Sequence, residues 1–455
     1  MPRMHACERS KVGVKAMIDN EKLYLHFNKA HMKTHGLMHE LRWRGLIFQL
    51  SNPTGLEEYL EGGSRALYCG FDPTADSLHI GSLVPLLALK RFQLQGHKPI
   101  LLLGGATGLI GDPSGRDDER NLNTKDVVGS WVESLRAQVG RFLDFDGENS
   151  AVICNNLDWT EKLDVVSFLR DVGKYFSVNG MIQRESVKAR LDREGQGISY
   201  TEFSYMLLQA MDFLELARRQ DCLIQIGGSD QWGNIVSGID LVRRHVGKEA
   251  FALTMPLVTK SDGAKFGKSA SGTIWLDPQK TSPYSFYQFW LNTADADVES
   301  FLKLFTFITE DEVASLVCET VDHPELRAGQ RKLAQEVTLL VHGEKALKSA
   351  ERISECLFVG EVTGLQEADL DQLQQDGLPS SVCEPGVGLL TAMVEVGLVK
   401  STGEARKLIQ GNGVKINGEP VTDPRMEISF DEALFGRFHL IRRGRKQYCL
   451  LVCGS

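Results

Sequence analysis

The sequence contains no apolar run approaching the roughly 20 residues that a helix needs to span a bilayer. Its nine cysteines include no Cys-x-x-Cys pair. An odd, scattered set of cysteines in a long chain argues against a disulfide framework or a structural zinc site. No period of 20 to 50 residues repeats. We therefore expect a globular protein of a reducing compartment, with no metal site and no membrane partner.

The length of 455 residues exceeds what one compact core accommodates, so about three structural units are expected. The net charge of −9 is unevenly distributed. Basic residues exceed acidic ones in 1–45 and in 385–455, whereas the segment between them is strongly acidic. Because an acidic middle does not attract polyanions by bulk charge, nucleic-acid binding would need the basic ends or local basic patches.

The first 40 residues combine five histidines with widely spread lysines and arginines, and they lack the apolar core of a secretory signal. This pattern is typical of an organellar transit segment, although serine is scarce and Glu8, Asp19 and Glu21 dilute it. A disordered leader without a targeting role is the alternative.

Short, continuously apolar segments separated by helix-length stretches indicate a parallel sheet covered on both faces. Four such strands are predicted, at residues 66–70, 99–105, 151–155 and 222–228. Ligands bind beyond the carboxyl ends of such strands, where three of the four run into glycine and allow close backbone approach. The sequence thus predicts an α/β fold whose Rossmann-like, parallel-sheet catalytic domain occupies residues 41–281.

The remaining chain divides by composition. Residues 282–378 have helical periodicity, and residues 379–385 form a linker after an acidic, polar stretch. Residues 386–455 are predicted to form a small α+β domain, in which Asn417-Gly418 between extended runs signals a hairpin.

The segment 68–83 carries the strongest motif. A predicted strand ends at Gly70, and a helix begins near His79. The backbone N–H groups and the positive dipole end of a helix start favour phosphate, and Gly81 leaves room for a flat base to pack on the backbone. A capped strand-to-helix turn with no ligand-binding role is the alternative.

A second motif, Lys265-Phe266-Gly267-Lys268-Ser269, places two lysines three residues apart in a glycine-containing loop. Such a loop can fold over a triphosphate and neutralise the charge that develops on departing pyrophosphate. A solvated turn is the alternative.

Polar groups between these motifs suggest a substrate site. Tyr205, Gln209 and Asp212 fall on one face of a predicted helix, an arrangement that is costly in a core unless the groups meet a polar ligand. A solvated polar face is the alternative. After the fourth strand, Asp230 can accept a hydrogen bond from a ribose hydroxyl, and Gln231 can hold a carboxyl group.

On these segments the chain resembles the tyrosyl-tRNA synthetases, a family of class I aminoacyl-tRNA synthetases, over roughly residues 41–455. The segment 68–83 resembles the first signature of the class, and 265–269 resembles its Lys-Met-Ser-Lys-Ser loop in the order that the family requires. Ser82 departs from the family pattern, which usually has a second histidine there. A serine can donate one hydrogen bond but cannot carry imidazolium charge.

The resemblance implies catalysis by positioning and charge stabilisation, with His79, Lys265 and Lys268 as the catalytic residues. It implies a tyrosine site in which the ammonium group meets Asp112, Tyr205 and Gln209. Tyr68 and Asp212 would bind the phenol, and Gln231 the carboxyl group. The implied ATP site comprises Cys69, Gly70, Asp72, His79, Gly81, Ser82, Gly228, Asp230, Val258, Lys265 and Lys268. For Asp112, a helix cap is the alternative interpretation.

In the implied reaction, the tyrosine carboxylate attacks the α-phosphate of ATP, supplied as its Mg²⁺ complex, and a tRNA ribose hydroxyl then attacks the tyrosyl-adenylate. ATP is a co-substrate here, and no tightly bound cofactor is expected. Phenylalanine would leave the phenol-binding groups desolvated and unpaired, a discrimination for which this family is the standard example.

The carboxy-terminal segment 386–452 resembles a small RNA-binding domain shared with a ribosomal small-subunit protein. Its candidate contacts to tRNA(Tyr) are Arg406, Lys407, Lys415, Arg442 and Arg443, with a solvated basic face as the alternative. This domain marks bacterial and organellar enzymes. With the basic leader, it favours the mitochondrial matrix over bacterial cytoplasm, and the family implies a homodimer.

Three other functions remain open at this point. A tryptophanyl-tRNA synthetase shares both nucleotide signatures, but the Tyr68–Asp212 pair and the carboxy-terminal domain disfavour it. A small-molecule nucleotidyltransferase would not need residues 385–455. A protein acting chiefly in RNA binding or intron splicing would not need the substrate and loop residues to be intact.

Overall fold

The computed structural model describes residues 36–114, 122–184, 187–188, 191, 197–263, 266–269 and 272–454. They fall into two compact units. Unit 1 extends to Leu276 and includes Ala294–Gly329, whereas unit 2 combines Asp277–Thr293 with the chain from Gln330 onward. The helical segment expected at 282–378 therefore contributes to both units. No helix in the described ranges is long and apolar enough to cross a membrane.

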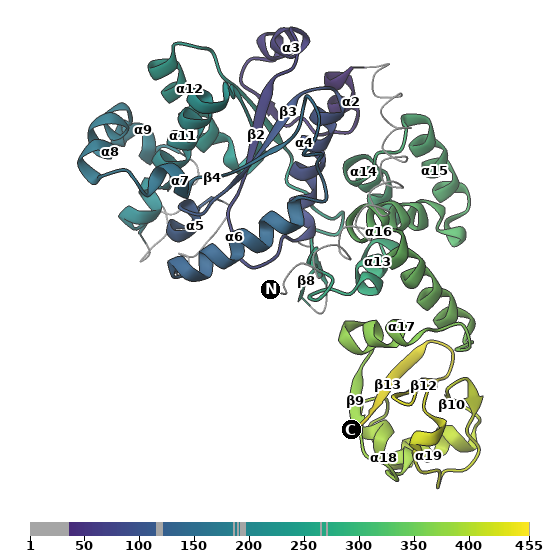
Figure 1. Ribbon diagram of the computed structural model, residues 1–455. Coiled ribbons are helices and arrows are strands. Elements are labelled where there is room, and N and C mark those ends of the chain that lie inside the picture. Colours follow the sequence, from purple (N-terminus) through teal and green to yellow (C-terminus); the bar gives the residue numbers. More distant parts are fainter. Residues whose placement is uncertain are drawn as a thin grey trace, which may run out of the picture. The chain divides into compact units, whose positions relative to one another are not determined.

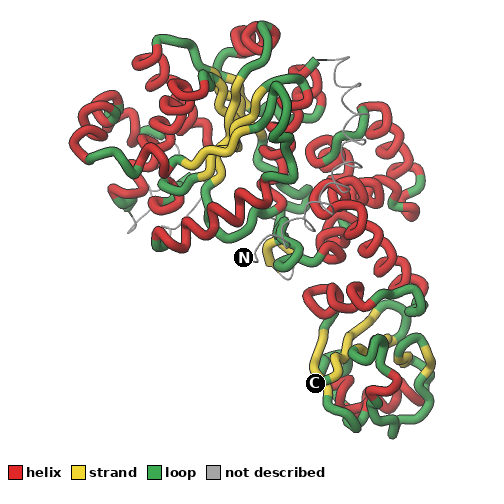
Figure 2. Tube along the Cα trace, viewed as in Figure 1, coloured by secondary structure: helices red, strands yellow, loops and turns green. Residues whose placement is uncertain are grey.

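Unit 1 is built on a six-stranded sheet in the order β1-β6-β5-β2-β3-β4, with helices on both sides (Figures 1 and 2). Strand β1 pairs antiparallel with β6, and the other neighbours pair in parallel. The strands are β1 Gln49–Leu50, β2 Ala66–Phe71, β3 Lys98–Leu103, β4 Val152–Asn155, β5 Ile224–Gly228 and β6 Phe251–Met255. The predicted α/β class with a parallel sheet is confirmed, and all four predicted strands are present within two residues at each end.

The helices of unit 1 differ in burial: those that pack on the sheet bury apolar faces, whereas Val165–Asp171 has no buried residue. They are α2 Leu37–Trp43, α3 Pro53–Glu61, α4 Leu83–Leu94, α5 Thr107–Ile110, α6 Lys125–Val139, α7 Leu157–Thr160, α8 Val165–Asp171, α9 Val178–Ile182, α11 Tyr200–Gln220, α12 Trp232–Val246, α14 Asp295–Phe305 and α15 Glu310–Asp322. Helix α11 begins where the Ser199 side chain accepts from the Glu202 N–H, and it ends at Asp221 in the left-handed conformation. Its buried face includes Tyr205 and Asp212.

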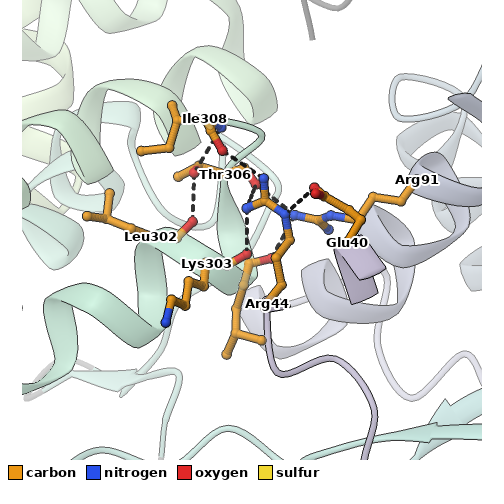
Figure 3. Close-up of polar contacts among 8 residues, drawn as sticks. Glu40, Arg44, Arg91, Leu302, Lys303, Thr306 and Ile308 are labelled. Atoms are coloured by element: carbon orange, nitrogen blue, oxygen red, sulfur yellow. Dashed lines mark hydrogen bonds and ion pairs between the residues drawn. The ribbon is translucent and has the colours of Figure 1, made fainter. Parts of the chain in front are cut away.

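Two buried arginines fix the carboxyl end of α14 (Figure 3). Arg44 donates to the backbone oxygens of Lys303, Thr306 and Ile308, and Arg91 donates to that of Thr306. Lys303 lies in the last turn of α14, Thr306 is its C-cap and Ile308 follows it, so the guanidinium groups bond carbonyls at the negative end of the helix dipole and just beyond it. Arg91 belongs to α4, which covers the sheet, and this explains why α14 belongs to unit 1.

Unit 2 contains α13 Pro283–Leu291, most of α16 Ala328–Val359, which kinks at Gly343, and α17 Glu367–Gln372. A five-stranded sheet follows, ordered β11-β10-β12-β13-β9, with α18 Leu389–Glu395 and α19 Thr402–Gln410 against it. Its strands are β9 Ser380–Cys383, β10 Val414–Ile416, β11 Glu419–Pro420, β12 Phe438–Arg443 and β13 Gln447–Cys453. The predicted α+β fold and the Asn417-Gly418 hairpin are present, and both turn residues have positive φ as the sequence requires.

Candidate active site

A cavity of about 730 Å³ opens beyond the carboxyl ends of β2, β3 and β5. Parallel sheets bind ligands at this edge, because the turns that follow the strands converge there. The predicted residues that line it are Tyr68, Cys69, Gly70, Asp72, His79, Gly81, Ser82, Asp112, Tyr205, Gln209, Asp212, Gly228, Gln231 and Val258. The structure therefore brings together side chains from segments up to 190 residues apart.

The predicted phenol-binding pair lines the cavity. Tyr68 and Asp212 are almost fully buried, at 1% and 2% exposure. Burial raises the pKa of the Asp212 carboxyl to about 7. Burial and the nearby Asp212 charge also hold the pKa of the Tyr68 phenol well above its usual value. Among the described residues, the Tyr68 hydroxyl has no hydrogen-bond partner, so it can serve a ligand.

Two residues that the sequence did not single out hold the Asp212 carboxylate. The Asn156 amide donates to one oxygen at 2.9 Å, and the Trp159 indole donates to the other at 2.8 Å. Both donors favour the ionised form and oppose the effect of burial. Asn156 directly follows the predicted strand 151–155, and this position at a strand end could have indicated a site residue. No sequence pattern indicates Trp159, because its partner Asp212 lies 53 residues away.

The predicted ammonium-binding residues belong to two separate sets of hydrogen bonds, one around Asp72 and one around Gln231. The Tyr205 hydroxyl donates to Asp72 at 2.7 Å, and Thr107 donates to the other Asp72 oxygen at 2.6 Å. Gln231 donates to Asp112 at 2.7 Å and accepts from Gln209 at 3.2 Å. These hydrogen bonds fix the carboxylate oxygens of Asp72 and Asp112, which therefore accept at defined positions in the cavity.

The charge of this region favours a cationic group. The carboxylates of Asp72, Asp112 and Asp212 all act on Tyr205 and, after its burial, raise the pKa of its phenol. No lysine or arginine of the described chain lines the cavity. Carboxylates gathered in a partly buried site attract a compact cation such as an ammonium group.

The first signature places His79 at the mouth of the cavity. Its Nδ1 accepts from the Gly81 N–H at 3.0 Å, capping the short helix Ile80–Ser82 that leads into α4. A neutral imidazole that accepts at Nδ1 carries its proton on Nε2, so Nε2 is the nitrogen that we expect to donate to an anionic ligand. The sequence expectation of a helix start near His79 matches this geometry.

Glycine is required at the end of β3 for steric reasons. A Cβ on Gly104 would lie 2.0 Å from an Asp72 oxygen, and one on Gly105 would lie 2.3 Å from an Asn155 oxygen. Any side chain would therefore displace the carboxylate that Tyr205 contacts. At β5, a Cβ on Gly228 would lie 2.4 Å from Asp230.

Cys69 and Asp230 are the predicted ribose contacts, and only Cys69 lines the cavity. Burial raises the pKa of the Cys69 thiol to about 12, so it remains protonated at neutral pH and is not a nucleophile. Burial also raises the pKa of Asp230, whose charge acts on Cys69. Asp230 contacts Gln231, although it is not among the residues that line the cavity.

The second signature lies against the first. Ile80 donates to the Ile274 carbonyl at 3.1 Å, and Ile274 donates to that of Gly267 at 3.0 Å. Gly267 has φ +84°, and a Cβ there would lie 3.3 Å from the Ile80 side chain. Lys265 lies outside the described residues, and of Lys268 only the backbone, in strand β7 Lys268–Ser269, is described.

The candidate RNA-binding residues differ in accessibility. Arg406 and Lys407 are exposed on α19, and Lys415 is half-buried on β10. Arg443 instead ties β12 to α19, through an ion pair with Glu404 at 2.8 Å. The Arg442 guanidinium lies against Gly360 at the end of α16.

Comparisons with known proteins identify relatives along most of the chain. Residues 61–359 match the family described as tRNA synthetases class I (W and Y). Residues 369–451 match the tyrosine--tRNA ligase SYY-like C-terminal domain. The tyrosine--tRNA ligases of Escherichia coli O139:H28 and Shigella boydii serotype 18 are each 56% identical over 421 residues, covering 92% of this chain and 99% of theirs.

A solved structure has the same fold. The C-terminally truncated mitochondrial tyrosyl-tRNA synthetase of Aspergillus nidulans is similar with a TM-score of 0.65 and 29% identity, over 75% of this chain and 100% of that one.

Proposed function

Because the chain belongs to the tyrosine--tRNA ligase family of class I aminoacyl-tRNA synthetases, we propose that it activates tyrosine with ATP and transfers the tyrosyl group to tRNA(Tyr). The observation that carries this proposal is the buried Tyr68–Asp212 pair in a cavity that Asp72, Asp112 and His79 also line. A tryptophan indole has no hydroxyl to match that pair.

Tyrosine is bound through complementary hydrogen bonds at both ends. The phenol donates to the Asp212 carboxylate and accepts from the Tyr68 hydroxyl. Its ammonium group meets Asp112, Tyr205 and Gln209, and its carboxylate lies towards Gln231. Phenylalanine offers nothing to Tyr68 and Asp212, so its activation leaves two buried polar groups unpaired.

Activation requires no protein nucleophile. The tyrosine carboxylate attacks the α-phosphate of ATP, which enters as its magnesium complex. His79 donates from Nε2 to the phosphate chain, and Lys265 and Lys268 offset the charge that develops on pyrophosphate. Gly70, Gly81 and Gly228 let the nucleotide approach the backbone, with Asp72, Ser82, Asp230, Cys69 and Val258 around it.

The test of this activity is pyrophosphate exchange with each of the twenty amino acids. Tyrosine should support exchange at least a thousandfold better than phenylalanine or tryptophan. Exchange driven better by tryptophan, or by no amino acid, would contradict the proposal. Tyr68→Phe should reduce tyrosine activation and narrow the preference over phenylalanine, because it removes only the phenolic donor.

The carboxy-terminal domain supplies a tRNA contact in this proposal. Arg406 and Lys407 lie exposed on α19, and Arg445 and Lys446 lie exposed at the turn between β12 and β13. Lys415, Arg442 and Arg443 complete the predicted set. Since Arg443 already pairs within the domain, the exposed pair on α19 should contribute most to phosphate binding.

Charge reversal tests this surface without removing the domain. Arg406→Glu with Lys407→Glu should lower tRNA charging at least tenfold and reduce its salt dependence, while pyrophosphate exchange stays within twofold. Arg243→Glu, on the exposed side of α12, is the control. An equal loss of exchange and charging in the double variant would contradict an RNA role.

A homodimer is also part of the proposal. Apolar side chains are exposed along α8 and α9, including Val165 and Val166 at 73% and 71% and Val178 at 57%. Exposed apolar patches of this kind mark protein interfaces. Val165→Glu with Val166→Glu should convert a dimer into a monomer in analytical ultracentrifugation, and an unchanged sedimentation coefficient would place the interface elsewhere.

For location, the mitochondrial matrix is proposed from the basic leader, with bacterial cytoplasm as the alternative. The Aspergillus nidulans relative is mitochondrial, whereas the relatives at 56% identity are bacterial and extend over nearly the same length. Residues 1–35 lie outside the described residues. A reporter fused to residues 1–40 should be imported and cleaved by isolated mitochondria, and a reporter left outside would favour the bacterial alternative.

A further inference from the structure

Helix α14 contacts the segment 261–269, which contains the second signature, at two points. The Asp297 carboxylate, 7% exposed, accepts from the Ser261 backbone N–H at 2.9 Å. Five residues further along the chain, the Phe266 ring stacks on Phe305 with centroids 5.2 Å apart and planes at 17°. The same ring meets Phe301 edge-on, also at 5.2 Å. The two contacts lie on either side of residues 262–265.

The platform beneath Phe266 is rigid. Phe301 and Phe305 are 2% and 0% exposed, and they pack edge to face with centroids 5.8 Å apart. The carboxyl end of α14 is held by Arg44 and Arg91, which are themselves buried (Figure 3). A ring resting on this platform is therefore fixed with respect to α4 and the sheet.

The contact of Phe266 with α14 matters because two lysines of the second signature are its near neighbours in the chain. Phe266 follows Lys265 directly and precedes Lys268 by two residues, so its Cα lies within about 8 Å of either Cα along the chain. Gly267, next to it, is buried and packs on Ile80 of the first signature. A half-buried phenylalanine between two lysines is thus a point at which this part of the chain is fixed to α14.

We propose that Phe266 is a positioning residue for nucleotide activation: by seating on Phe301 and Phe305 of α14, it sets where Lys265 and Lys268 can reach the departing pyrophosphate. Asp297 performs the same task at the start of the segment, through Ser261. This inference rests on the proposed function, since it gives the lysines their role in ATP activation. A lysine charge stabilises the departing pyrophosphate only if it is held close to it in the transition state. The packing of Phe266 on α14 restricts where the lysines can lie.

Phe266→Ala in the full-length protein tests the proposal. We expect kcat for tyrosine-dependent pyrophosphate exchange to fall at least tenfold, while KM for tyrosine and the rate of transfer from preformed tyrosyl-adenylate to tRNA change less than twofold. Phe266→Leu should recover most of the loss, because an aliphatic side chain still packs on Phe305. Phe48→Ala, at an exposed position of the same unit, is the matched control.

A double-mutant cycle separates positioning from general stability. If Phe266 acts through the lysines, adding Phe266→Ala to Lys268→Ala should cost little more than Lys268→Ala alone. Full additivity, an unchanged kcat in Phe266→Ala, or an equal loss of activation, tyrosine binding and transfer would each overturn the inference. Absence of tyrosine-dependent exchange in the unmodified protein would instead refute the proposed function.

Discussion

Trp159→Phe should make tyrosine activation strongly pH dependent, because Trp159 is one of two donors that keep Asp212 ionised. The Asp212 pKa of about 7 already lies close to neutrality. A hydrogen bond to a charged group contributes about 1.5–3 kcal/mol, which corresponds to a pKa rise of roughly one to two units when the bond is lost. Phenylalanine keeps an aromatic ring at this site but donates nothing.

The magnitude follows from the ionised fraction. With a pKa near 7, about three quarters of the Asp212 carboxyls are ionised at pH 7.5, against roughly a tenth with a pKa near 8.5. When the pKa of the Asp212 carboxyl is raised, tyrosine activation is lost at pH values below the new pKa, where the carboxyl is protonated. Activation returns at pH values above it. We therefore expect kcat/KM for tyrosine to fall about eightfold at pH 7.5 and to recover to within about twofold at pH 9.

The assay is pyrophosphate exchange at both pH values, with phenylalanine as a second substrate. Phenylalanine makes no bond to Asp212, so its slow activation should lack this pH dependence. Trp131→Phe, at a half-buried position of α6 that does not line the cavity, is the control. A variant-to-wild-type ratio that is equal at pH 7.5 and pH 9 would refute the assignment of Trp159 as the group that keeps Asp212 ionised.

Three further predictions address the scaffold and the cavity. Arg44→Met should lower the free energy of unfolding of unit 1 by about 3–5 kcal/mol, because it leaves the buried Glu40 carboxylate and the carbonyls of Lys303 and Ile308 without their partner; thermal unfolding against the surface variant Arg243→Met measures this, and equal melting temperatures would refute it. Gly104→Ala should raise KM for tyrosine more than tenfold, since its Cβ would lie 2.0 Å from Asp72; an unchanged KM would show that the carboxylate can move without cost. Cys69 should resist iodoacetamide at pH 7.5 in the folded protein, since its thiol is buried with a pKa of about 12; mass spectrometry should find alkylation at the exposed thiol of α15 instead, and rapid labelling of Cys69 would contradict the burial.

The sheet could be predicted because its strands are continuous apolar runs that end in glycine or asparagine. Strand β6, Phe251–Met255, was not singled out, since the buried Thr254 interrupts its apolar pattern. Strand β1 has two residues and exists only through its pairing with β6. Such pairing is a tertiary contact that no local propensity encodes.

Part of the site followed from local periodicity. Tyr205, Gln209 and Asp212 share a helical face, so their convergence could be read from spacing alone. The partner of Tyr205, Asp72, lies 133 residues away. The donors to Asp212 likewise come from another element. Contacts of this range are fixed by the order of the strands in the sheet, which the sequence pattern did not specify.

The hydrogen-bond donors and acceptors already used within the cavity limit what Tyr205 and Gln231 can offer a ligand. The Tyr205 hydroxyl donates its one proton to Asp72, so towards a ligand it can only accept, which fits an ammonium group. Both amide protons of Gln231 are directed at carboxylates, at 2.7 Å to Asp112 and 3.3 Å to Asp230. Gln231 can therefore donate to a substrate carboxylate only by releasing one of them. In the proposed binding mode, an ammonium group that neutralises Asp112 weakens the bond from Gln231. We therefore expect ammonium binding to make the Gln231 amide available to the substrate carboxylate.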